Sequence, residues 1–477
     1  MLASDDCTCY QEPLSVWNQS APRVYICVVL CFPCDDRLRG DAVRHIEHAL
    51  ERLARERPVF AGRLHSNSSG RVTLRRSPLH DIPFKVIPSE DGNEHDYEQL
   101  KEAGFPPATF VRSRFGLSGI IGSNCESIPV SKVHAEFARG GLMLSIYLHH
   151  GLVDGGSLRI FLETFAAQTR DIPIDLPSEQ AFSLNPNPRL RSTTTARIHN
   201  ESNFEKLVAN CPEYTILKDL SGPTQPRILN MGESMSNIER TGKIFVFRNE
   251  RLQKLREKVQ KINGSAHLPS AYTSLAALAF AHITKARTKV EKYLSESEPS
   301  QTAMLWNSVN WRTRAFQHAT ENYFGNAALP AVTRVPKSQL VAACSDEYKL
   351  AKLVPIVKSS IDAVDEDYVR RRLAMLSHAP DPRLVGVNYD PRMAEVLAFN
   401  TWRHFGADVE WSIPGVPVAK PDAIRRAHGG WNLGTALILP ARTDSPTQEL
   451  FVSLSVDAME LLCEDEGWMC WVDRVIG

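Results

Sequence analysis

The feature that most constrains this chain is a short segment in which a strand pattern gives way to a helix pattern around two histidines and an acid. The segment reads His149-His150-Gly151-Leu152-Val153-Asp154-Gly155. Before it, apolar residues alternate with a period of two over residues 141–148, which predicts a half-buried strand. After it, apolar residues recur at helical spacing, at Leu158, Phe161, Leu162 and Phe165. A side chain mounted between two such rigid elements is held at a fixed position.

The period of the strand separates the two histidines. Continued by two residues, the alternation places His150 on the face of Leu148 and His149 on the opposite face. Three interpretations of the pair are open at this point. The histidines are ordinary structural residues, or His150 and Asp154 contribute to a metal site that needs a third ligand, or one imidazole is a general base.

The composition is that of a globular protein with several domains. The chain has 477 residues, of which 43% are hydrophobic and 23% charged, and its net charge is zero. This balance gives no indication of a nucleic-acid or anionic-membrane partner. Acidic residues stand at the N-terminus where a secretory signal carries basic ones, and the longest apolar stretch, residues 24–34, is too short for a bilayer. We therefore expect a soluble, cytoplasmic protein.

Cysteine usage agrees with that compartment, since ten cysteines without a secretion signal are expected to be free thiols. Cys31 and Cys34 have CxxC spacing, but no second CxxC or histidine pair follows at a zinc-like distance. A zinc or redox role for this pair is the less favoured alternative, and the sequence predicts no metal site.

Strand-like and helix-like segments are mixed in both halves, which predicts an α/β fold with two comparable domains. The expected divisions are an N-terminal domain over residues 1–190, a linker over 191–235 and a C-terminal domain over 236–477. The linker follows from the polar, proline-bearing composition of residues 183–200. The chain lacks a Gly-x-Ser-x-Gly elbow, a phosphate loop and a Gly-x-Gly-x-x-Gly segment after a strand, which disfavours hydrolase and nucleotide-binding classes.

Six motifs in order make the chain resemble the BAHD-type acyltransferases, specifically the fungal branch that contains trichothecene 3-O-acetyltransferase. They are Leu14–Gln19, Pro58–Leu64, Gly140–Leu144 with His150-x-x-x-Asp154-Gly155, Val309–Arg314, Asn322–Asn326 and Ala419–Arg425. One block departs from the family pattern. The family's Asp-Phe-Gly-Trp-Gly survives only as Asp408-Val-Glu-Trp411, which puts the geometry of the CoA end of the channel in doubt.

The resemblance implies two similar chloramphenicol-acetyltransferase-like domains of mixed β-sheet flanked by helices, with a channel between them. It implies an enzyme that moves an acyl group, most simply acetyl, from acyl-CoA to a hydroxyl of a secondary metabolite, as in fungal toxin biosynthesis. Acetyl-CoA is then a co-substrate, no cofactor is permanently bound, and a monomer is expected. A neutral imidazole suits the removal of a hydroxyl proton, and a thioester needs no further activation.

The resemblance also assigns residues. His150 is the general base, and Asp154 organises its loop by pairing with Arg312, while Gly155 and Gly156 permit a tight backbone. The phosphates of CoA are expected to meet basic side chains, at Arg314, Lys254 and Lys258. Solvated surface cations remain the alternative interpretation of these arginines and lysines.

Two other functions stay open at this stage. Condensation domains that form amides share the His-His-x-x-x-Asp-Gly pattern, although they work beside carrier proteins and no carrier segment is visible in this chain. A catalytically silent family member that binds a metabolite is the second alternative, because the Asp408 block is eroded.

Overall fold

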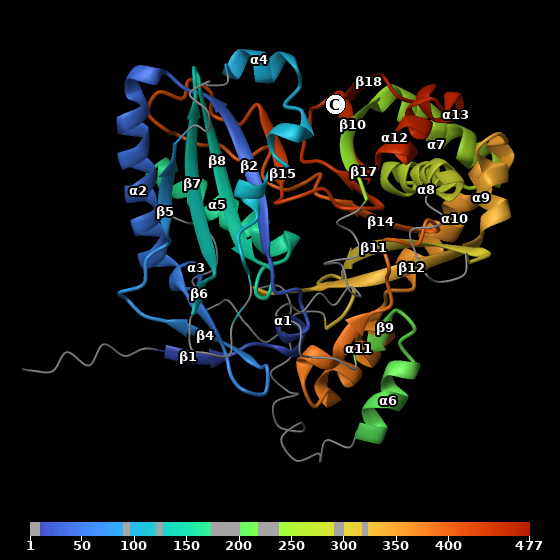
Figure 1. The fold of residues 1–477 in the computed structure, drawn as a ribbon, viewed down its shortest axis with the longest axis horizontal. Coiled ribbons are helices and arrows are strands. Elements are labelled where there is room, and N and C mark those ends of the chain that lie inside the picture. The colour runs from blue at the N-terminus through green and yellow to red at the C-terminus, as the bar shows by residue number, and fades with distance from the viewer. Residues whose placement is uncertain are drawn as a thin grey trace, which may run out of the picture.

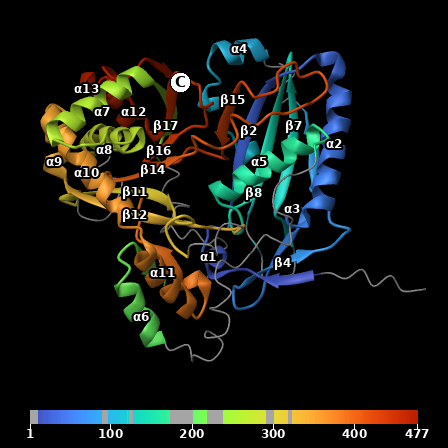
Figure 2. The same cartoon turned by 180° about the vertical axis from the view of Figure 1, so that it is seen from behind.

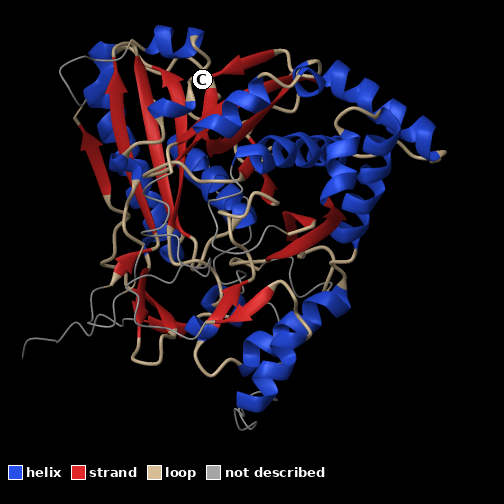
Figure 3. Cartoon of the chain, turned by 45° about the vertical axis from the view of Figure 1, so that its right-hand side comes forward, coloured by secondary structure: helices blue, strands red, loops and turns tan. Residues whose placement is uncertain are grey.

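The computed structural model describes residues 10–88, 96–119, 121, 127–172, 201–217, 238–290, 300–316 and 323–477. Two mixed sheets, each with helices on it, stand side by side and form the two halves of the molecule (Figures 1 and 2). Helices lie on the faces of both sheets and also in the middle of the molecule (Figure 3). The predicted α/β class with two sheet-containing domains is confirmed.

The N-terminal domain is built on a five-stranded sheet. Its strands, in spatial order, are β15 (Ala423–Ala427), β2 (Tyr25–Pro33), β8 (Gly141–His149), β7 (Ser131–Ala138) and β5 (Phe84–Ile87). The helices of this half are α1 (Val16–Gln19), α2 (Arg39–Glu56), α3 (Pro58–Ala61), α4 (Tyr97–Glu102) and α5 (Gly155–Thr169). A four-stranded sheet lies below, with β1 (Tyr10–Pro13), β4 (Val72–Arg76), β3 (Arg63–Ser66) and β6 (Ile128–Pro129).

The C-terminal domain is built on a seven-stranded sheet. Its strands, in order, are β12 (Ala328–Pro336), β11 (Thr302–Asn310), β14 (Val396–Thr401), β16 (Thr435–Ile438), β17 (Thr447–Ser455), β10 (Arg240–Arg248) and β18 (Arg474–Ile476). Its helices are α7 (Asn249–Asn263), α8 (Ala271–Val290), α9 (Lys337–Ala343), α10 (Glu347–Asp362), α11 (Glu366–His378), α12 (Val456–Cys463) and α13 (Glu466–Met469). The apolar helix α8 is buried along most of its length, and Ser270 caps its start by accepting from Thr273 N at 3.0 Å.

The predicted half-buried character of the strand before the histidines is wrong, because every residue of β8 is buried. One face, with Leu144 and Ile146, joins the main core under α2 and α5. The other face, with Met143 and Tyr147, is covered by an aromatic cluster from the segment around Tyr97. The period of two thus identified the two faces correctly, but both are covered.

The polypeptide does not divide between the sheets at the expected boundaries. The strand β15, from the range 236–477, pairs with β2 and completes the N-terminal sheet. Within the expected linker 191–235, residues 201–217 form α6 (Glu201–Ala209) and β9 (Tyr214–Ile216), and β9 pairs with β13 (Val385–Val387). The remainder of that linker lies outside the described residues. Chain crossover between sheets leaves no composition signal, which explains why the sequence did not indicate it.

Candidate active site

His149 is the last residue of β8 and is fully buried on the face opposite the main core. Its Nε2 lies 2.8 Å from the carbonyl of Gly119, and its Nδ1 accepts from the backbone N–H of Gly151 at 3.0 Å. Its ring packs edge-on against Tyr25. Burial lowers the pKa of His149 to about 4, so this imidazole is neutral and both its nitrogens are occupied.

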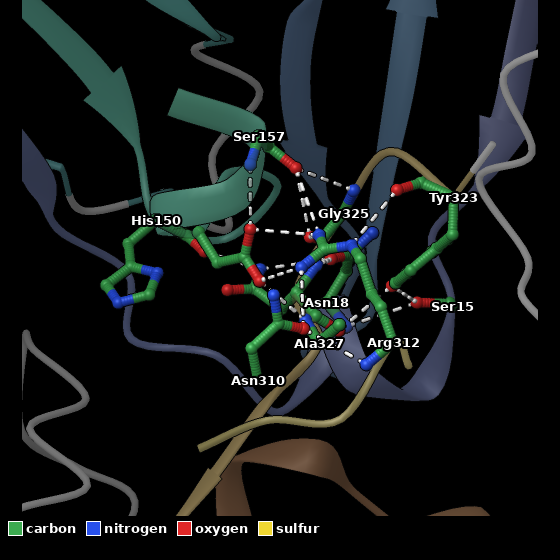
Figure 4. Close-up of polar contacts among 11 residues, drawn as sticks. Ser15, Asn18, His150, Ser157, Asn310, Arg312, Tyr323, Gly325 and Ala327 are labelled. Atoms are coloured by element: carbon green, nitrogen blue, oxygen red, sulfur yellow. Dashed lines mark hydrogen bonds and ion pairs between the residues drawn. The ribbon is translucent and has the colours of Figure 1, made fainter. Parts of the chain in front are cut away.

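His150 lies just past the strand and is partly exposed. Its backbone is fixed at both ends, since its N–H donates to Val24 O and its carbonyl accepts from Asn326 Nδ2, each at 2.8 Å. The ring points away from Arg312 and Tyr323 (Figure 4). Nδ1 is shielded from solvent, which leaves Nε2 as the nitrogen for a reactant. Burial lowers the pKa of His150, and the nearby Asp154 charge works against this shift, so the imidazole is neutral at pH 7.

Asp154 is the N-cap of α5 and is buried. Its Oδ1 accepts from Ser157 N at 2.9 Å and its Oδ2 from Ala327 N at 2.8 Å. Both oxygens also accept from the guanidinium of Arg312, Nη2 to Oδ1 and Nη1 to Oδ2, at 2.9 Å each. Burial alone would raise the pKa of this carboxyl, but Arg312 and the two backbone donors hold it below its usual value.

Arg312 connects this carboxylate to the segment that precedes β12. Its Nη2 donates to the carbonyl of Gly325 at 2.6 Å and to Ser157 Oγ at 3.3 Å. The same hydroxyl accepts from Gly325 N and lies 3.1 Å from that residue's carbonyl (Figure 4). The start of α5, the turn after β11 and the segment before β12 are therefore one hydrogen-bonded unit.

A second contact, which the sequence did not indicate, ties the N-terminal segment to this unit. Asn18, in the short helix α1, accepts through Oδ1 from Asn326 N at 2.8 Å and from Asn326 Nδ2 at 3.0 Å. Because Nδ2 of Asn326 also donates to His150, Asn18 positions the amide that supports the histidine backbone. Both asparagines lie in motifs of the family resemblance, but no pattern shows that residues 308 positions apart touch.

The two glycines of the motif are required by space and not by backbone conformation. Neither has a positive φ, and both lie in the first turn of α5. A Cβ on Gly155 would come within 2.2 Å of the Phe405 ring, and one on Gly156 within 2.8 Å of Nη1 of Arg312. The side chains that approach the two glycines closely, Phe405 and Arg312, thus come from the C-terminal domain.

The three basic residues expected to meet CoA lie apart from His150. Lys254 and Lys258 lie on α7, at the outer side of the C-terminal domain (Figures 1 and 2), and Lys258 pairs with Glu347 at 2.5 Å. Arg314 Nη1 donates to the carbonyl of Ile361 at 2.7 Å, at the end of α10. The structure shows no contact between these side chains and the histidine loop, and their role toward CoA stays a prediction.

The eroded block is ordered in the structure. Trp411 is buried and packs edge-on against Phe32 and Phe165. Asp408 accepts from Thr443 through its backbone N–H at 3.0 Å and its hydroxyl at 2.6 Å. Trp411 and Asp408 are thus both anchored in this structure, without the two glycines of the family pattern.

Three properties bear on the expectations from the sequence. In the part of the chain that the structure describes, no three His, Cys, Asp or Glu side chains gather as metal ligands. Cys31 and Cys34 are buried, and burial raises the pKa of Cys31 to about 12, which makes it a poor thiolate. None of the helices within the described residues combines the length and hydropathy that a bilayer span requires.

The fold and the site together define a protein of two sheet-containing domains with an imidazole at their junction. Solved structures share this fold over the whole chain. TRI101 of F. graminearum, in complex with Coenzyme A and T-2 mycotoxin, matches with a TM-score of 0.76 at 18% identity, covering 98% of this chain and 100% of that one. Vinorine synthase matches with a TM-score of 0.60 at 17% identity, over 99% and 96% of the two chains.

Sequence comparison gives the family. The profile of the Transferase family matches residues 123–468, and that of the trichothecene 3-O-acetyltransferase-like N-terminal domain matches residues 24–166. The chain therefore belongs to the Transferase family, that of the BAHD-type acyltransferases, and the resemblance drawn from the motifs is confirmed. Trichothecene 8-O-acetyltransferase of Fusarium sporotrichioides is 24% identical over 98% of each chain. An acyltransferase of Emericella nidulans is 22% identical over 95% of this chain and 93% of its own.

Proposed function

We propose that this enzyme transfers an acetyl group from acetyl-CoA to a hydroxyl of a small secondary metabolite, with His150 as the general base. The observation that carries the proposal is the state of His150. Its backbone is fixed at both ends, its Nδ1 is shielded, and burial keeps the imidazole neutral. The names of the full-length relatives, O-acetyltransferase and acyltransferase, support the acyl-transfer class.

The chemistry follows from that single nitrogen. Nε2 of His150 takes the proton of the acceptor hydroxyl as its oxygen attacks the thioester carbonyl. When the tetrahedral intermediate collapses, the carbon–sulfur bond breaks, and the imidazolium returns the proton to the sulfur of CoA. The new ester and free CoA leave a neutral His150, so no enzyme-bound acyl group is needed. Binding both substrates in one site supplies much of the remaining acceleration.

Asp154 has a positioning role in this proposal. Its two oxygens accept four hydrogen bonds, from Arg312, Ser157 and Ala327, and its carboxyl is ionised. A carboxylate so fully occupied is not placed to exchange a proton with His150. Its negative charge instead favours the imidazolium that forms during the reaction.

A thiol-release assay tests the proposal. Purified protein is given acetyl-CoA with a panel of hydroxylated terpenoids and other alcohols, and matched amines are included to detect an amide-forming enzyme. We expect ester formation with at least one alcohol and a loss of about 10²–10⁴-fold in kcat/KM for His150→Ala. His149→Gln is the matched control, since it changes the neighbouring imidazole. An equally active His150→Ala variant, or transfer to amines alone, would contradict the proposal.

We further propose that the enzyme works as a cytoplasmic monomer on small-molecule substrates. The seven cysteines of the described residues are free thiols, as expected in a reducing compartment, and the net charge of zero favours no polyanionic partner. Light scattering on the protein as it elutes from a sizing column checks the monomeric state, and a dimer mass would overturn it. Cell fractionation checks the cytoplasmic location, and recovery with the secreted proteins would overturn that.

A further inference from the structure

Three basic side chains lie near one another where the two sheets meet. Arg426 belongs to β15, Arg240 is the first residue of β10, and His428 follows β15. The strands that carry the arginines run close together at the centre of the molecule (Figures 1 and 2). Burial, together with the positive charges of Arg426 and Arg240, lowers the pKa of His428 to about 4. Arg240 and Arg426 are hydrogen-bonded to two consecutive residues, Trp431 and Asn432, which places the two guanidinium groups near each other.

The two guanidinium groups are held in place by neutral partners. In the amide orientation that satisfies both groups, Oδ1 of Asn432 accepts from Nη2 and Nη1 of Arg426 at 2.7 and 3.2 Å. Nη1 of Arg240 donates to the carbonyl of the adjacent Trp431 at 2.6 Å. Among the described residues neither arginine forms an ion pair, and burial alone determines the direction of both pKa shifts.

The neighbouring arginine, in contrast, has a carboxylate partner. Arg425 points to the other face of β15 and pairs with Glu449 at 2.7 Å, while its remaining donors reach the carbonyls of Gly104 and Phe105. No shielded carboxylate of this kind stands beside Arg426 in the described part of the chain. An unpaired cation in such surroundings is costly, and an incoming anion would remove that cost.

Arg426 is half-buried on β15, and its charge persists at pH 7 because burial lowers its pKa only to about 10. A guanidinium presents a planar fork of donors that matches a carboxylate or a phosphate.

The strand register places Arg426 on the face of the N-terminal sheet that carries His150. Arg426 is directly opposite Val28 on β2, and Val28 is directly opposite Ile146 on β8. Residues opposite each other on neighbouring strands share a face, as do alternate residues along one strand. The alternation from Ile146 through Leu148 leads to His150. The arginine and the histidine therefore belong to the same side of the N-terminal sheet.

We propose that Arg426 and Arg240 form an anion-binding site between the two sheets, which holds a carboxylate or a phosphate group of a bound substrate. That the bound molecule is a substrate rests on the proposed acyl transfer, whereas the site itself rests on the two arginines. The anion comes from one of two sources, the phosphates of CoA or a carboxylate on the acceptor or acyl group.

Titration calorimetry on the full chain at low ionic strength tests the site without requiring turnover. The probes are CoA, pantetheine as its phosphate-free counterpart, and citrate as a carboxylate. We expect Arg426→Gln and Arg240→Gln each to weaken the binding of CoA or of citrate at least tenfold and to leave pantetheine unchanged. Weaker binding of CoA in these variants identifies phosphate as the bound group. Weaker binding of citrate alone identifies a carboxylate.

Arg37→Gln is the matched control, because it removes one positive charge from an exposed side chain paired with Asp35. We expect it to bind all probes as the unmodified chain does. Arg426→Lys keeps the positive charge but loses the planar set of donors. Its affinity for the anion is therefore expected to lie between those of Arg426→Gln and the control. It replaces Arg426→Gln in the test if that variant does not fold. Affinities for both anions within twofold of the control in both glutamine variants would overturn the site. A chain that binds these anions but transfers no acyl group would overturn only the proposed function.

Discussion

Arg312 and Asp154 form a two-pronged ion pair across 158 positions of sequence, with both guanidinium-to-carboxylate distances at 2.9 Å. The pair joins the C-terminal half of the chain to the first turn of the helix that follows His150. Both side chains are shielded from water, so each charge would destabilise the native protein if the other were removed. The catalytic loop is therefore fixed by a residue of the other domain.

Replacing Arg312 is expected to destabilise the protein strongly. Arg312→Gln leaves the buried Asp154 charge uncompensated and should lower the free energy of unfolding by about 3–5 kcal/mol. Denaturant unfolding measures the effect. Arg139→Gln is the control, since its pair with Asp96 is solvent-exposed and is expected to contribute less than about 1 kcal/mol. The double variant Asp154→Asn/Arg312→Gln should lose less than the sum of the single changes, and a strictly additive result would speak against the coupling.

The rate of acyl transfer is expected to keep its plateau into mildly acidic solution. Only the neutral imidazole of His150 accepts a proton, so activity falls as pH drops through its pKa. Burial places that pKa below the ordinary value of 6.5. The acidic half-maximum of kcat/KM should therefore lie below pH 6.5 in the free enzyme. A half-maximum clearly above 6.5 would mean that the net effect of the surroundings on His150 is opposite to that of burial.

The local structure around the histidines followed from the sequence because it is encoded by neighbouring residues. The change of period predicted the strand, the turn and the helix, and strand parity separated His150 from His149.

What could not be predicted depends on contacts between distant segments. The burial of both faces of β8 required knowing that an aromatic cluster covers the second face, and the cluster is drawn from segments around Tyr97, Phe105 and Phe115. The contact of Asn18 with Asn326 and the insertion of β15 into the N-terminal sheet join residues hundreds of positions apart. Periodicity carries no information about such pairings, and the family motifs supplied only the order of the segments.

His149 is expected to make the stability of the protein sensitive to mild acid. Its pKa is lowered by burial to about 4, against 6.5 in an unfolded chain. Between these values the unfolded chain binds a proton that the native protein does not, so the unfolding free energy falls as pH drops from 6.5 toward 4. The slope from this residue is about 1.4 kcal/mol per pH unit at most. His149→Gln should flatten the unfolding profile in this window, and an unchanged profile would assign the acid sensitivity to other groups.

The two glycines of the motif are expected to respond differently to a single methyl group. Gly156→Ala places a Cβ 2.8 Å from Nη1 of Arg312, a side chain that can shift only by loosening its hold on Asp154. Gly155→Ala meets the ring of Phe405 at 2.2 Å, so this aromatic side chain of the C-terminal domain must move. Both changes should lower the unfolding free energy, by about 1–3 kcal/mol, and Gly156→Ala should also reduce kcat. The control is Gly40→Ala in α2, where the nearest atom is 3.6 Å away and alanine favours the helix. If the variants at 155 and 156 matched that control in stability and rate, the contacts between the domains at this turn would not constrain the catalytic loop.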